Sequence, residues 1–543
     1  MSRSERFTDA CRATLLILAV FAVGQAIHIR DGEYDGIAIR WIGVALAGTL
    51  AAMLLPGLPG REKLLRPATL GGAAAITLAA AACLIQLLRS PPSGWNEWSN
   101  DLKLDDERNL LIFRTGLGFA AAAITALFAA DLKWWQKGIA VLLVGAMVGL
   151  AVVIRVPAFY VLPGDRGIDY DAMPSAAFHA LYTAATTSLL MLISRKGRWA
   201  ISFAAFLVLH LLLGIWMVRS CPNPHIDVYV FQQLGAKALL AGDNPYAVTY
   251  PDIYAATDQA QDREVYGKGL SKDGQLAFGF PYPPLSLLLS TAGYFVGGDH
   301  RYAQAVAIPL AALLLAFARP GRWGGLAAIL LLLTPRAFFI IGRGWTEPFV
   351  VLMLALVIFT AYRKPRLLPI ALGLFLASKQ YLVFAVPLAW LLVPNPRDWK
   401  AAVRLIGGAL LVAAVVTLPL ALWDLKSFWH STVTVQQVAP FREDALSWLV
   451  WWYQRSPIKD VKPEAWIAFA VAIPVLVLAL AICPRNPAGF CLAIAAVYLP
   501  FIAFNKQAFA NYYFFVIGAM VCALSALRPL VEEVQPSPKN CSP

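Results

Sequence analysis

Lysine and glutamine side chains interrupt two long apolar stretches of this sequence, at Ser378-Lys379-Gln380 and at Asn505-Lys506-Gln507. A charge at membrane depth is energetically expensive and usually functional. Ammonium and amide groups at the end of an apolar segment can hold an anion such as a phosphate through charge-assisted hydrogen bonds. The alternative for each lysine is an anchor whose long side chain reaches the lipid head groups. Other polar groups near the ends of apolar segments are Arg343, Glu347 and Asn511.

Asp227 lies where a helical pattern begins. The apolar residues Val228 and Phe231 follow it at helix spacing, and the segment 241–246, Ala-Gly-Asp-Asn-Pro-Tyr, contains the glycine and proline that end a helix. A carboxylate at a helix start either complements the helix dipole or, where it faces a substrate, accepts a proton as a general base. Position alone leaves both roles open. The nearby Asp243 lies in a Gly-Asp-Asn-Pro turn signature, so we interpret it as a turn residue.

The elements that must position these groups are long apolar segments. Hydrophobic residues make up 59% of the 543 residues and charged residues only 14%, a composition that indicates lipid as the solvent. A membrane span needs about 20 apolar residues, and stretches near that length recur throughout. The first group is 13–28, 42–57, 68–88, 110–130, 138–156, 174–194 and 199–218. The second group, with several shorter members, is 283–298, 302–318, 323–342, 345–361, 367–378, 381–393, 402–423, 465–483, 487–504 and 509–527. The predicted fold class is an all-α polytopic membrane protein.

Basic residues in the short loops predict the orientation. Loops rich in Lys and Arg stay cytoplasmic, which places the N-terminus inside and two long loops, 219–281 and 424–464, outside. Arg319 and Arg322 also have a cytoplasmic pattern, which fits only if 283–298 dips into the membrane and returns, or if the rule fails locally. The other basic residues assigned to the inside are Arg61, Lys63, Arg66, Lys133, Lys137, Arg195, Lys196, Arg198, Arg363, Lys364, Arg366, Arg397 and Lys400.

Charge and cysteine content narrow the function classes. The net charge of +13 follows from this topology and favours contact with anionic membrane lipid. No basic patch interleaved with stacking aromatic residues occurs, so we do not expect nucleic acid as a partner. The seven cysteines and six histidines show no metal-ligand spacing, which argues against a metal site and a disulfide framework.

Three stretches, in this order, resemble the GT-C superfamily of membrane glycosyltransferases, and more closely glycosyltransferase family 87, the polyprenyl-phosphate-mannose-dependent mannosyltransferases. They are Asp227-Val228-Tyr229 with 241–246, then Tyr282-Pro283-Pro284-Leu285, then Ser378-Lys379-Gln380.

The resemblance divides the chain into three parts. The glycosyltransferase-like module covers 196–527, and 528–543 is expected to be a cytoplasmic tail. Such families begin their catalytic module near the first span, whereas here residues 1–195, with six predicted spans, come first. We treat this N-terminal module as a scaffold or partner-binding module.

The resemblance implies a GT-C-like bundle of transmembrane helices with outer-face loops and juxtamembrane helices, in a multi-pass protein of a bacterial plasma membrane. It implies inverting transfer of mannose, or another hexose or pentose, from a polyprenyl-phosphate donor to a lipid or glycan acceptor at the outer face. In such families an aspartate of the first outer loop is the base, here Asp227. Residues expected to bind the donor phosphate are Arg343, Lys379 and Lys506. Residues expected to bind the substrates are Tyr229, Tyr282, Glu347, Gln380, Gln507 and Asn511. We expect no metal or other cofactor, because cationic side chains can stabilise the leaving phosphate.

Two other function classes stay open. A transporter or flippase of lipid-linked saccharides would use many spans and outer-face cations, and it predicts an inverted repeat and charges near the midplane, neither of which is visible in the sequence. An assembly protein using the aromatic 424–464 loop as an interface would leave the lysines unexplained. A transferase should bring Asp227, Lys379 and Lys506 to one outer cavity, while a transporter should show a pathway to the cytoplasmic side.

Overall fold

The computed structural model describes residues 3–55, 184–185, 187–188, 192, 199–255 and 265–528, apart from 320, 335 and 458–461. The predicted spans 68–88, 110–130 and 138–156, most of 174–194, and the tail beyond 528 lie outside the described residues. The described chain is mainly helical, which confirms the all-α prediction. A short antiparallel hairpin in the loop after α8 pairs β1 (Ser271–Lys272) with β2 (Gln275–Leu276).

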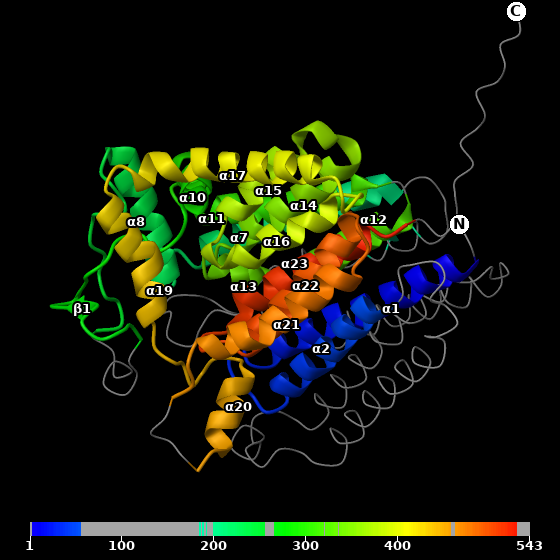
Figure 1. The fold of residues 1–543 in the computed structure, drawn as a ribbon. Helices are drawn as coiled ribbons and strands as arrows, with labels where there is room; N and C mark the ends of the chain where they lie inside the picture. Colours follow the sequence, from blue (N-terminus) through cyan, green and yellow to red (C-terminus); the bar gives the residue numbers. More distant parts are fainter. Residues whose placement is uncertain are drawn as a thin grey trace, which may run out of the picture.

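Most helices form one bundle (Figure 1). Its longer helices are α1 (Arg3–Ile29), α2 (Ala38–Leu54), α7 (Trp199–Ser220), α10 (Pro284–Gly297), α11 (Arg301–Ala318), α12 (Arg322–Leu332), α14 (Glu347–Arg363), α15 (Leu368–Ala377), α17 (Trp399–Ala421), α21 (Trp466–Ile482), α22 (Pro487–Ala503) and α23 (Ala510–Ser525). The connecting elements are α8 (Asp227–Ala241), α13 (Ala337–Gly342), η2 (Pro365–Leu367), η3 (Gln380–Phe384), α16 (Ala385–Leu388), η4 (Ala389–Leu392), α18 (Leu425–Trp429), η5 (His430–Thr434), α19 (Val435–Val438) and α20 (Trp448–Arg455).

Four of the described helices are long and apolar enough to cross a membrane, at Thr8–Ile29, Trp199–Ser220, Arg301–Ala318 and Trp399–Ala421. The other apolar helices of the bundle have 10 to 17 residues. The membrane class predicted from composition therefore agrees with the structure.

Successive helices run between two ends of the bundle (Figure 1). At one end, which we call the α8 end, α7 finishes and α8 begins. At the opposite end, which we call the basic end, arginine side chains form hydrogen bonds with backbone carbonyls of neighbouring helices. Arg319, after α11, donates to the carbonyl of Ala526 after α23 (2.9 Å), and Arg363, at the end of α14, donates to the carbonyl of Phe317 in α11 (2.8 Å).

A buried arginine fixes the start of α11 at the α8 end. The guanidinium of Arg301 donates to the carbonyls of Gly342 (2.9 Å), Val218 (3.2 Å) and Cys221 (2.7 Å), and it forms an ion pair with Asp299 (2.6 Å). Its side chain is fully buried. The Arg301 guanidinium thus donates to carbonyls at the ends of α7 and α13, which lack a helical donor. One side chain therefore joins the start of α11 to the ends of α7 and α13.

Helix α10 starts and ends at the α8 end. Its 14 residues extend about 21 Å, which is less than the roughly 30 Å of a hydrocarbon core. The carbonyl of Gly298, just past its end, accepts from Gln233 of α8 (2.7 Å). From there α11 carries the chain to the basic end, where Arg319 follows it. Whether 283–298 dips into the membrane, as the cytoplasmic pattern of Arg319 and Arg322 would require, stays a prediction.

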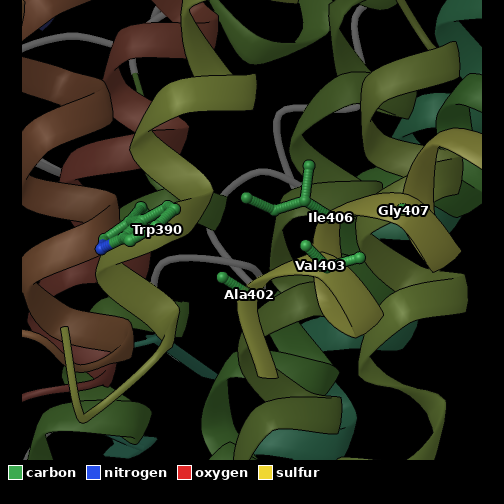
Figure 2. A pocket seen from close by; sticks show the side chains of 5 residues that line it. All are labelled: Trp390, Ala402, Val403, Ile406 and Gly407. Atoms are coloured by element: carbon green, nitrogen blue, oxygen red, sulfur yellow. The ribbon is translucent and has the colours of Figure 1, made fainter. Parts of the chain in front are cut away.

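Helix α17 lies along the outside of the bundle and packs mainly on α15. Ala402, Leu405 and Ala409 are buried against α15, while Val403, Leu411 and Val415 are exposed. A small apolar crevice separates its first turns from Trp390 of η4 (Figure 2). An apolar face this large, open on a helix long enough to span, is expected to contact lipid.

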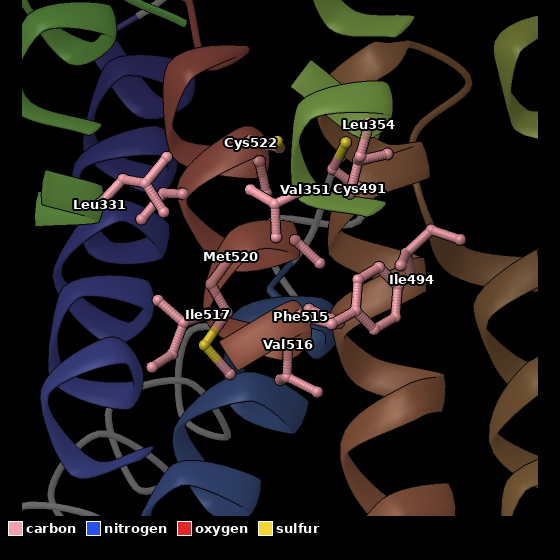
Figure 3. Packing of buried hydrophobic residues seen from close by; sticks show 14 of the residues in the cluster. Leu331, Val351, Leu354, Cys491, Ile494, Phe515, Val516, Ile517, Met520 and Cys522 are labelled. Atoms are coloured by element: carbon pink, nitrogen blue, oxygen red, sulfur yellow. The ribbon is translucent and has the colours of Figure 1, made fainter. Parts of the chain in front are cut away.

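Helices α22 and α23 form the centre of the core (Figure 3). Both are apolar and buried all round, as expected of a helix surrounded by others. Gly518 allows α23 to approach α14, since a Cβ there would lie 2.4 Å from Val351 Cγ2. Helices α1 and α2 pack against α23 and α22. The first two helices of the predicted N-terminal module thus share one core with the predicted glycosyltransferase-like module.

Candidate functional site

The polar residues singled out in the sequence gather mainly at the α8 end. Helix α8 begins at Asp227 and is followed by Gly242 in the left-handed conformation (φ 85°), so the helix predicted from the sequence is confirmed. The chain then folds over α8 around an aromatic cluster that contains Phe231, Tyr250, Phe278 and Phe280. This cluster gives the long loop after α8 a core of its own, which holds the loop's tyrosines in place.

The Asp227 carboxylate is partly buried among tyrosine hydroxyls. Its Oδ2 accepts from the hydroxyl of Tyr266 (3.2 Å), and its Oδ1 accepts from the N–H of Val228 (2.7 Å). The N–H of Asp227 in turn donates to the hydroxyl of Tyr254 (3.3 Å). Burial raises the pKa of the Asp227 carboxyl, while these hydrogen bonds and the charge of Arg442 oppose the rise. A carboxylate with a raised pKa suits proton transfer near neutral pH.

Lys379 and Glu347 form a buried ion pair beneath Tyr282. Lys379 Nζ lies 3.1 Å from Glu347 Oε1 and donates to the Thr346 hydroxyl (2.5 Å). The side chains are 3% and 0% exposed, so the pair has little water to screen it. Lys379 Nζ also lies 4.3 Å from the centre of the Tyr282 ring. Glu347 balances the lysine charge, and the ammonium supports the tyrosine ring by a cation–π contact.

Tyr282 lies beside the ion pair and within electrostatic range of Asp227. Its hydroxyl lies within electrostatic range of both Asp227 and Glu347, and burial together with these charges raises the Tyr282 pKa. Tyr512 of α23 lies within electrostatic range of the same two carboxylates. Tyr282 and Tyr512 therefore belong to one cluster with Asp227, Glu347 and Lys379, which come from separate parts of the chain.

Two arginines add positive charge to this cluster. Arg442 forms an ion pair with Asp444 (2.6 Å), and its charge also acts on Asp227 and Tyr254. Arg343 is 5% exposed and acts on Tyr254 as well. Arg343 is a residue expected from the sequence. Arg442 was missed, because an arginine in a mixed Phe-Arg-Glu-Asp segment looks like an ordinary surface charge.

Lys506 and Gln507 hold the segment that contains Arg442. Lys506 Nζ donates to the carbonyl of Gln437 (3.1 Å), and Gln507 Nε2 donates to the carbonyl of Pro440 (3.1 Å). The carbonyl of Lys506 accepts from the N–H of Arg442 (3.0 Å). Lys506 is half-buried, and burial lowers its pKa. Lys506 therefore lies at the rim of the cluster, where it holds the backbone of Arg442.

The remaining predicted substrate-binding residues have different places. Tyr229 donates to the carbonyl of Pro222 (2.9 Å), and its ring lies 4.8 Å from the Arg301 guanidinium, so it belongs to the support beneath α8. Gln380 donates to the carbonyl of Pro281 (3.4 Å) beside Tyr282. Asn511 is buried next to Tyr512, whose hydroxyl it contacts.

The first linker of the chain, 30–37, also reaches this end. Asp31 forms an ion pair with Arg336 (2.7 Å) and acts electrostatically on Arg343. Asp31 and Arg336 both adopt φ values of the left-handed region (55° and 67°), a conformation uncommon outside glycine. The N–H of Tyr34 donates to the carbonyl of Asp444 (2.8 Å). The linker therefore contacts Asp444, the ion-pair partner of Arg442, and places Asp31 within electrostatic range of Arg343.

Among the residues that the structure describes, no group of three or more His, Cys, Asp or Glu side chains could hold a metal ion. No known protein family, curated protein or solved structure matches this chain.

Proposed function

We propose that this protein is a membrane glycosyltransferase that moves a sugar from a polyprenyl-phosphate donor to a hydroxyl group of a lipid or glycan acceptor. The acceptor oxygen attacks the anomeric carbon, and the bond between that carbon and the phosphate oxygen breaks. The acceptor proton goes to Asp227, and the phosphate leaves with the bonding electrons. A single carboxylate base with attack from the opposite face gives inversion at the sugar carbon.

The observation that carries the proposal is the environment of Asp227. Its carboxylate is partly buried at a helix start, with the hydroxyls of Tyr254 and Tyr266 around it and Arg442 within electrostatic range. Complementing the helix dipole needs only the start of α8, whereas the Asp227 carboxylate also accepts from Tyr266 and lies within electrostatic range of Arg442. A proton acceptor beside cations is what attack on a sugar phosphate requires.

Arg343 and Arg442 are the residues we assign to the leaving phosphate. Both act on Tyr254, which lies next to Asp227, and a guanidinium can bind phosphate through two parallel hydrogen bonds. Glu347 balances the charge of Lys379, so we assign Lys379 to positioning Tyr282. Each correctly placed hydrogen-bond donor stabilises the transition state by about 2.7–4 kcal/mol.

The charge distribution supports a site on the outer face. The basic end carries Arg319, Arg322, Arg363, Lys364, Arg366, Arg397, Lys400, Arg404 and Arg485. An excess of Lys and Arg in short loops marks the cytoplasmic side. The α8 end, with Asp227, then faces the opposite compartment, where lipid-linked sugars and a glycan acceptor meet.

Sugar transfer by the purified protein in lipid tests the proposal. The donor is radiolabelled polyprenyl-phosphate mannose, the acceptors come from a membrane extract, and the variant is Asp227→Asn. The matched control is Asp243→Asn, which makes the same change at an exposed turn residue of the same loop. We expect Asp227→Asn to lower turnover by about 10²–10⁴ and Asp243→Asn to leave it unchanged.

Two outcomes would contradict this function. Equal labelling by wild type and Asp227→Asn would remove Asp227 from catalysis. Donor that crosses the bilayer without a new glycosidic bond would favour the transporter class considered from the sequence.

A further inference from the structure

The outward face of α17 changes from basic to apolar along its length. Lys400 and Arg404 occupy its first turns, and Leu411, Val415 and Leu422 continue the same exposed face. Arg404 and Leu422 are about 27 Å apart along the helix axis, close to the roughly 30 Å thickness of a hydrocarbon core. The basic turns therefore lie at the level of lipid head groups when the apolar turns lie in the hydrocarbon.

An apolar crevice opens beside these basic turns. Its volume is about 260 Å³, and it is lined by Trp390, Ala402, Val403, Ile406 and Gly407. Figure 2 shows the Trp390 ring facing α17 with its ring nitrogen directed away. The crevice is smaller than the roughly 300–1,000 Å³ of a pocket for a drug-sized ligand and presents no polar group. Its size and lining suit a segment of one hydrocarbon chain.

Three exposed cations lie close along the chain to the residues that line the crevice. Arg397 precedes α17, Lys400 and Arg404 lie within one turn of Val403, and Arg404 Nε donates to the carbonyl of Lys400 (3.4 Å). Asp398 is the only acidic residue between 390 and 410, and its carboxylate caps α17 by accepting from the N–H of Ala401 (2.9 Å). The net charge of this segment is therefore positive, which is complementary to an anionic head group.

We propose that this crevice and its cations form a binding site for one anionic diacyl phospholipid of the leaflet at the basic end. The phosphate-containing head group lies against Arg397, Lys400 and Arg404, and one acyl chain enters the crevice between Trp390 and α17. Asp227 lies at the opposite end of the bundle. The lipid site is therefore independent of the proposed glycosyl transfer.

Native mass spectrometry of the detergent-solubilised full chain, titrated with dioleoyl phosphatidylglycerol or dioleoyl phosphatidylcholine, tests the site. We expect one tightly bound phosphatidylglycerol. Each Lys or Arg near an anionic lipid contributes about fivefold in affinity. The variant Arg397→Gln/Lys400→Gln/Arg404→Gln should therefore lose a preference on the order of 100-fold for phosphatidylglycerol.

A matched triple variant controls for net charge. Lys237→Gln/Lys268→Gln/Lys272→Gln removes three exposed lysines at the α8 end and should keep the preference. If both triple variants lose the preference equally, or if wild type binds the two lipids equally, the assignment is overturned.

A second pair of variants tests the acyl chain. Gly407 lines the crevice, and a Cβ there would meet nothing within 4 Å, so Gly407→Trp is the substitution chosen to fill the crevice. It should lower the affinity for dioleoyl phosphatidylglycerol at least tenfold, since the burial of two methylenes accounts for that much. The affinity for dihexanoyl phosphatidylglycerol should be unchanged. Val415→Trp, on the exposed face two turns further on, is the control. Unchanged dioleoyl binding by Gly407→Trp would exclude the crevice.

Discussion

Removal of either partner of the Glu347–Lys379 pair should destabilise the fold, whereas removal of both should cost much less than the sum. The two charges are 3.1 Å apart and their side chains are 0% and 3% exposed, so neither can be solvated once its partner is lost. Breaking a buried ion pair costs about 3–5 kcal/mol because a buried charge remains. We therefore expect Glu347→Gln and Lys379→Met each to lower the free energy of unfolding by about 3–5 kcal/mol.

The double variant Glu347→Gln/Lys379→Met measures the coupling between the two charges. It leaves no buried charge, so its loss of unfolding free energy should be smaller than the sum of the single losses by about 3 kcal/mol. The assay is equilibrium unfolding in mixed micelles, with Lys364→Met, an exposed lysine at the basic end, as the control. The reasoning fails if Lys379→Met leaves unfolding unchanged and raises the KM for the lipid-phosphate donor. That result would show a lysine that binds phosphate directly, as the sequence predicted.

Further predictions concern the Asp227 cluster. The pKa of Asp227 is raised in the folded protein, so its carboxyl stabilises the fold below the unfolded pKa, and this contribution is lost as pH rises through the folded pKa. At neutral pH, Asp227→Asn should therefore unfold at a higher temperature than wild type. Thermal unfolding across pH measures this difference, which should disappear near pH 4. Arg442→Gln removes a charge that lowers the Asp227 pKa. The ascending limb of the pH–rate profile should therefore move to higher pH, and turnover should fall by about 10²–10³. The control Arg455→Gln, at an exposed arginine of α20, should change neither the pH–rate profile nor the turnover. Tyr266→Phe removes a hydrogen bond to the carboxylate and should move the same limb upward; a shift to lower pH would contradict the hydrogen-bond direction.

Local features of the site could be predicted from the sequence. The glycine in 241–246 predicted the end of α8, and Gly242 has the left-handed conformation that a helix end favours. The interruption of an apolar run at Ser378-Lys379-Gln380 indicated that Lys379 has a special environment. These signals lie within a few residues of the feature that they predict, so one sequence is enough to find them.

Pairings between distant segments could not be predicted in the same way. Glu347 and Lys379 are separated by the whole of α14 and α15, and nothing in either segment indicates that their ends meet beneath Tyr282. Arg442 lies near Asp227 only because Lys506 and Gln507 bind the 437–442 segment. The sequence assigned Lys506 to a phosphate, whereas its ammonium contacts a carbonyl of this segment.

The pairing of Lys379 with Glu347 changes which groups can stabilise a departing phosphate. A cation stabilises developing negative charge best when no carboxylate shares its charge at short range. Lys379 is buried against Glu347, and Arg442 shares its charge with Asp444 but also acts on Asp227. An incoming phosphate would have to compete with Asp444 for Arg442, while competition for Lys379 would leave Glu347 buried without a counter-charge. The second exchange costs more, so the arginines, and not the buried lysine, are the groups from which phosphate binding should be sought.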